Sequence, residues 1–96
     1  MTSSLPSDLQ GKAEFLKAIA HPTRLAILEV LTHGPLCVQH VGELLERAQP
    51  NISQHLSVLR QAHLITYTEQ GKQRCYSLED PVLIGQLLEL LSQAPR

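Results

Sequence analysis

The segment from residue 47 to 63 combines a helical pattern with a polar face that carries no carboxylate. Ile52, Leu56 and Leu59 follow the i, i+4, i+7 spacing that gives a helix one buried stripe, which continues at His63 or Leu64. Pro50 suits the first helical position, because the N–H that proline lacks would have no partner there. The opposite face is predicted to expose hydrogen-bonding side chains: Asn51, Gln54, His55 and Ser57, with Ser53 at its edge.

Two interpretations of this face remain open from the helix alone. An exposed helix usually mixes both signs of charge, so amides, hydroxyls and an imidazole without acids suit the grooves of a polyanion, where they can pair with base edges and phosphates. The alternative is an ordinary solvated helix surface. The neighbouring segments have to decide between them.

Charge is segregated along the chain although its net value is only −1. A near-neutral total argues weakly against a nucleic-acid partner, since such domains are often basic. The segment from Arg47 to Arg74, however, contains four basic residues and only one acid, Glu69. Its net charge is therefore +3, while the rest of the chain carries −4. This distribution is what a DNA-binding face on an otherwise acidic protein requires.

The length of 96 residues predicts a single domain over residues 1–96, with flexible tails at 1–6 and 94–96. A chain this short buries about 60–65% of its unfolded surface, so oligomerisation would help to stabilise it. No apolar run approaches the ~18 residues of a membrane span, and the N-terminus lacks a basic region followed by an apolar one. We therefore expect a cytoplasmic protein without a membrane partner.

The order of expected elements defines a fold class. We expect a helix up to about residue 20, a helix from Pro22 to Gly34, a short strand at 36–38, helices at 39–47 and 49–62, strands at 64–69 and 73–78, and a last helix after Asp80. This α-α-β-α-α-β-β-α order is mainly α with a small β-hairpin (α+β), the winged helix-turn-helix arrangement. Lys72 and Arg74 flank the hairpin tip, either as phosphate contacts or as solvated charge.

The first and last helices are more apolar than one contact requires. The first has two apolar stripes, and the last has almost no polar face, so a second copy of the chain is the expected partner. The predicted homodimer interface consists of Leu9, Leu16, Leu83, Leu87, Leu88 and Leu91.

These motifs, taken in order, resemble the ArsR/SmtB family of bacterial transcriptional repressors. The resemblance is carried by residues 18–25 (AIAHPTRL), 36–38 (LCV), 49–56 (QPNISQHL), Leu59-Arg60, Gly71-Lys72 and 76–78 (YSL), and it covers residues 8–92. It implies a homodimeric repressor that binds an imperfect inverted repeat in double-stranded promoter DNA. The DNA-contacting residues that it implies are Gln49, Asn51, Ser53, Gln54, His55, Arg60, Lys72, Gln73 and Arg74, and Ser57 of the same polar helix face is predicted to join them. Arg24 is interpreted as structural, or at most as a phosphate contact.

The chain departs from the family pattern at the residues that bind the inducing ion in other members. Members usually release DNA when a metal or metalloid ion binds, but of the three cysteines of the arsenic-sensing branch only Cys37 is present. The ligands of the zinc-sensing branch are also missing, because residues 81–96 contain no His and only the acid Glu89. In a winged helix the strand with Cys37 pairs with the strand with Cys75, so a disulfide or polysulfide between them is one hypothesis. Two buried, inert thiols, or an unusual metal site with His40, are the others.

Other protein classes fit less well. The chain has no Gly-rich phosphate loop and no Gly-x-Ser-x-Gly motif, so we do not expect an enzyme. The competing prediction is a winged helix that serves as a protein-interaction or dimerisation module without specific DNA binding, which would agree with the near-neutral charge.

Overall fold

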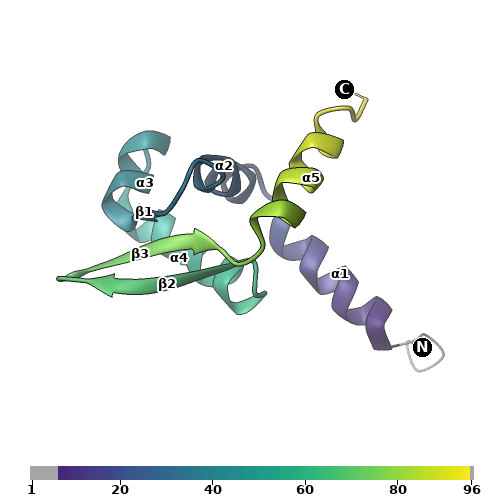
Figure 1. Cartoon of the computed structure of the whole chain (residues 1–96), viewed down its shortest axis with the longest axis horizontal. Helices are drawn as coiled ribbons and strands as arrows, with labels where there is room; N and C mark the ends of the chain where they lie inside the picture. Colours follow the sequence, from purple (N-terminus) through teal and green to yellow (C-terminus); the bar gives the residue numbers. More distant parts are fainter. Residues whose placement is uncertain (1–6, 96) are drawn as a thin grey trace.

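The computed structural model of the chain describes residues 7–95, and in this range it has the predicted winged helix-turn-helix order (Figure 1). Helices and strands follow one another as α1 (Ser7–Ile19), α2 (Pro22–Leu31), β1 (Leu36–Cys37), α3 (Val38–Leu45), α4 (Gln49–Gln61), β2 (Ile65–Gln70), β3 (Gln73–Leu78) and α5 (Pro81–Leu91). Val38 begins α3 rather than ending β1, so the first strand is shorter than predicted. No helix in the described range is both long and apolar enough to cross a membrane.

The three strands form an antiparallel sheet in the order β1-β3-β2. Gln70 pairs with Gln73, which leaves Gly71 and Lys72 as the two-residue turn of the wing. Gly71 has a φ of +64°, a conformation that glycine adopts without steric cost. β1 adds to the other edge of β3, with Cys37 opposite Cys75, as the sequence predicted.

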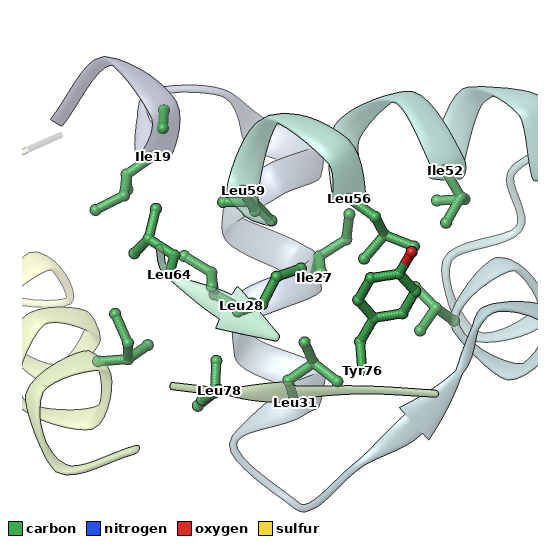
Figure 2. Packing of buried hydrophobic residues seen from close by; sticks show 14 residues of the cluster. Ile19, Ile27, Leu28, Leu31, Ile52, Leu56, Leu59, Leu64, Tyr76 and Leu78 are labelled. Carbon is green, nitrogen blue, oxygen red and sulfur yellow. The ribbon is translucent and has the colours of Figure 1, made fainter. Parts of the chain in front are cut away.

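The hydrophobic core lies beneath α4 (Figure 2). Ile52, Leu56 and Leu59 are fully buried, which confirms the predicted stripe, and they pack in one cluster with the buried residues of α2, among them Ile27 and Leu28. The stripe continues at Leu64 and not at His63, since His63 is exposed and has a φ of +65°, beyond the end of the helix. The buried face of α4 therefore holds the helix on the core, and its polar side chains lie on the surface.

α1 and α5 stand at the end of the molecule away from the hairpin tip (Figure 1). Asp80 caps α5 as predicted, accepting a hydrogen bond from the Leu83 N–H at 3.0 Å. At the far end of this helix the Ala94 N–H donates to the Leu91 carbonyl oxygen. The remaining parts of the predicted tails, residues 1–6 and 96, lie outside the described residues.

The predicted interface residues fall into two groups in the isolated chain. Leu9, Leu16, Leu83 and Leu91 are between 43% and 57% exposed, so nothing in the described chain covers them fully. Leu87 and Leu88 are instead half-buried and pack against the chain's own core. Two residues outside the predicted set, Val82 and Leu90, are 69% and 65% exposed.

Candidate nucleic-acid interface

The turn between α3 and α4 sets the position of the predicted recognition helix. Glu46 ends α3 in the left-handed conformation, and the Arg47 N–H donates to the Gly42 carbonyl oxygen at 3.1 Å. A Cβ on residue 42 would lie 3.2 Å from the Arg47 carbonyl oxygen, so the tight turn favours glycine there. Ala48 then precedes α4, which starts at Gln49, with Pro50 in its first turn.

A cleft of about 390 Å³ separates α4 from the wing. Its walls bring together all but three of the residues that the sequence assigned to DNA contact. From α4 and the wing these are Gln49, Ser53, Ser57, Arg60, Lys72, Gln73 and Arg74, and Val38, Gln39 and Tyr76 complete the lining. Gln73 Oε1 is buried without a hydrogen-bond partner among the described residues, so the cleft holds an unused acceptor.

Tyr67 connects the two cationic parts of this surface, a role that sequence analysis missed. The Arg74 guanidinium lies over the Tyr67 ring at 4.5 Å from its centroid, and the Arg60 guanidinium lies at 5.2 Å from the same centroid. Both are favourable cation–π distances. One cation from α4 and one from the wing are thus held on a single ring, although the alternation of β2 alone gave no sign that Tyr67 would meet both.

The three remaining predicted contact residues lie elsewhere on α4. Asn51 and Gln54 are exposed, whereas His55 is half-buried. Arg24 Nη1 of α2 lies 3.2 Å from His55 Nδ1, and the His21 ring centroid is 4.4 Å from that of His55. The Arg24 side chain therefore links α2 to α4, which supports its structural interpretation, and this contact with α4 was not foreseen.

His55 gives the fold a pH dependence. Burial, then the nearby His21 and Arg24, lower the pKa of His55 below its ordinary value of 6.5. The unfolded chain therefore binds more protons than the folded one as pH falls through about 6.5, so this contribution to stability is present above that pH and is lost below it. We expect a lower urea midpoint at about pH 5.5 than at about pH 7.5, and a smaller difference in His55→Gln. An equal difference in both proteins would contradict this assignment.

The two cysteines form a disulfide between β1 and β3. Cys37 also occupies the N-cap position of α3, so the bond joins the first helix of the helix-turn-helix to the wing. His40 is exposed on α3. Within residues 7–95 no three His, Cys, Asp or Glu side chains are grouped so that they could hold a metal ion. With the Cys37 sulfur bonded to Cys75, these residues do not fit the metal site with His40 that the sequence left open.

Comparisons with known proteins agree with this architecture. The family model described as bacterial regulatory protein, arsR family, matches residues 21–67, from the start of α2 into β2. The transcriptional regulator NmtR of Mycobacterium tuberculosis is 38% identical over 89 residues, which cover 90% of this chain and 73% of that protein. The chain belongs to the ArsR family. The resemblance seen in the sequence motifs is thereby confirmed.

Further similarities place this ArsR-family chain among transcriptional regulators. The transcriptional repressor SmtB of M. tuberculosis is 34% identical over 86 residues, or 90% of this chain, which spans 64% of that repressor's length. HlyU from Vibrio cholerae N16961 has the same fold, with a TM-score of 0.82 and 29% identity over 93% of this chain and 100% of the HlyU chain. The relatives are named as regulators and not as enzymes, in agreement with the sequence.

Proposed function

We propose that this ArsR-family chain binds double-stranded operator DNA as a homodimer and represses transcription from that promoter. The observation that carries the proposal is the shared cleft: α4 and the wing that follows it in the chain bring amides, hydroxyls and three cations to one surface. On α4 this surface carries no acid. Exposed Asn51 and Gln54 supply the paired donor and acceptor that suit the edge of adenine. Such a regulator works where DNA lies, so we place it in the cytoplasm.

The homodimer follows from the exposed leucines of α1 and α5. Leu16 is 57% exposed and Leu83 is 46% exposed, in a chain too small to leave much apolar surface in water without cost. These two helices stand away from the wing (Figure 1), so a second copy could dock there and leave both DNA surfaces free. Two copies would then meet successive major grooves about 34–36 Å apart.

A matched pair of substitutions separates base recognition from backbone contact. Gln54→Ala should relax the preference at one base pair, with a loss of about 1–3 kcal/mol against the preferred base only. Lys72→Ala should weaken binding to every sequence alike and lower the slope of log K against log salt by about 1. Fluorescence anisotropy with the operator and with single-base variants measures both effects. Uniform weakening in Gln54→Ala would contradict the assignment of α4 to base recognition.

We infer that the signal is oxidation of the Cys37 and Cys75 thiols. The pair can form a disulfide when hydrogen peroxide accepts two electrons: two S–H bonds and the O–O bond break, one S–S bond and two O–H bonds form, and two waters leave. Because the bond joins the start of α3 to β3, it constrains the two parts that approach DNA together. We expect the oxidised wing to fit the operator less well, so that the repressor leaves DNA. A metal or metalloid inducer is the weaker candidate, since within residues 7–95 Cys37 belongs to no group of three His, Cys, Asp or Glu side chains that could bind such an ion.

A further inference from the structure

Three helices meet at the Arg24 side chain. Its Nε donates to the Ala18 carbonyl oxygen at 2.6 Å, and Nη2 donates to the Lys17 carbonyl oxygen at 3.4 Å, both in the last turn of α1. The third nitrogen, Nη1, lies 3.2 Å from His55 Nδ1 on α4. The guanidinium is thus held by α1 and α2, and it reaches the imidazole of the recognition helix from a fixed direction.

The chemistry of this contact determines where the His55 proton lies. A guanidinium has hydrogens on all three nitrogens and no acceptor, so His55 Nδ1 has to accept the bond. A neutral imidazole carries a hydrogen on only one of its two ring nitrogens, which must then be Nε2. Protonation at Nδ1 would place two hydrogens between the groups and break the contact. Burial, His21 and Arg24 lower the pKa of His55, which agrees with a neutral ring.

His21, the N-cap residue of α2, also accepts a hydrogen bond through Nδ1. The Thr23 backbone N–H donates to His21 Nδ1 at 3.0 Å, where His21 caps the helix. This imidazole also accepts through Nδ1, so its hydrogen is on Nε2 as well. The His21 and His55 rings lie 4.4 Å apart, inclined by 43°. Both neighbours of His55 therefore favour an uncharged ring, and the Arg24 contact places its hydrogen on Nε2.

We propose that Arg24 is a positioning residue that presents His55 to DNA solely as a hydrogen-bond donor through Nε2–H. The proposal rests on the proposed function of α4 as the recognition helix. Asn51 and Gln54 each offer a donor and an acceptor, so they can pair with either kind of base edge. His55 in this state can pair only with an acceptor, namely a phosphate oxygen or the N7, O6 or O4 atoms of bases, and it disfavours the amino groups of adenine and cytosine. Arg24 thereby affects sequence preference without touching DNA.

The first test uses the free protein. Long-range proton–nitrogen spectra report which His55 nitrogen carries hydrogen, and at what pH the ring becomes charged. We expect Nε2–H alone in the wild type, and in Arg24→Met a mixture of both tautomers with a titration midpoint closer to about 6.5. Arg60→Met is the matched control, because Arg60 lies over Tyr67, and it should leave the His55 signals unchanged. His55 signals that are the same in Arg24→Met and the wild type would overturn the proposal.

The second test separates the two ends of the imidazole on DNA. His55→Gln places an amide N–H near the position of Nε2, whereas His55→Asn places its amide near Nδ1, so only the first variant keeps a donor toward DNA. We expect near-wild-type operator affinity for His55→Gln and a loss of about tenfold for His55→Asn. A loss confined to one base pair identifies a base acceptor, and a loss on all sequences identifies a phosphate oxygen. Equal affinities for both variants would overturn the proposal.

The two tests also distinguish failure of this inference from failure of the proposed function on which it rests. A wild-type chain that binds no operator overturns the proposed function, and with it the role of His55 on DNA. A chain that binds its operator specifically but has unchanged His55 signals in Arg24→Met overturns this inference alone. If Arg24→Met fails to fold, the wild-type spectra still test the Arg24 contact, because a hydrogen on His55 Nδ1 would be incompatible with it and would overturn the proposal. The comparison of His55→Gln with His55→Asn then tests the donor at Nε2, since both variants leave Arg24 bonded to α1.

Discussion

Replacing Leu16 with glutamate should convert the dimer into a monomer and lower operator affinity at least about a hundredfold. Leu16 is 57% exposed in the isolated chain, on the predicted interface helix α1. A buried, unpaired carboxylate costs about 3–5 kcal/mol, which exceeds the roughly 2.7 kcal/mol that corresponds to a hundredfold loss. A monomer also loses the gain from binding two linked half-sites. Light scattering after size exclusion measures the mass, and fluorescence anisotropy measures the affinity.

Leu44 provides the matched control for this experiment. It is 60% exposed, but it lies on α3 and not on α1 or α5. Leu44→Glu should therefore remain a dimer at concentrations where Leu16→Glu and Leu83→Glu are monomers. A dimeric Leu16→Glu that binds the operator normally would contradict the assignment of the interface to α1. A monomeric Leu44→Glu would place the interface on α3 instead.

Forming the disulfide should stabilise the fold and lower the affinity of the protein for the operator. Cys37 and Cys75 are 38 residues apart in sequence, and closing a loop of this length reduces the entropy of the unfolded chain by an amount worth about 4 kcal/mol. We expect urea unfolding of the oxidised protein to show up to that gain over the reduced protein. Operator affinity should change in the opposite direction, since the bond ties the wing to the start of α3.

A variant with Cys37→Ser and Cys75→Ser is the control for both measurements. Its stability and its operator affinity should be the same with and without reductant, and its affinity should match that of the reduced wild type. Mass spectrometry confirms that the wild-type sample is fully oxidised before it is assayed. Equal affinities of the fully oxidised and the reduced wild type would refute the thiol signal, whatever the effect on stability.

Local sequence signals predicted the parts of this fold that depend on neighbouring residues. Pro50 and the spacing of Ile52, Leu56 and Leu59 placed α4 and its buried face, and the helix begins at Gln49, one residue before Pro50. Gly71 marked the wing turn, since the positive φ of the hairpin favours glycine. The opposition of Cys37 and Cys75 followed from the pairing of β1 with β3 in a winged helix.

The features that sequence analysis missed arise where elements cross in space. The contact between Arg24 and His55 joins residues 31 positions apart, and it depends on how α2 packs under α4. The shared position of Arg60 and Arg74 on Tyr67 depends on the distance between helix and wing, which no periodicity encodes. On α5 a nearly uniform apolar surface could not reveal that Leu87 and Leu88 pack on their own core while Leu83 and Leu91 stay exposed.

The most direct test of the account is binding of the wild-type protein to DNA from its own promoter, compared with a scrambled duplex over a range of salt concentrations. If α4 and the wing form a DNA-reading surface, the reduced dimer should bind an inverted repeat at least about a hundredfold more tightly than the scrambled duplex. Its log K should also fall linearly with log salt. Binding to promoter DNA that is absent at every salt concentration would contradict the account and favour a winged helix that serves as a protein-interaction module.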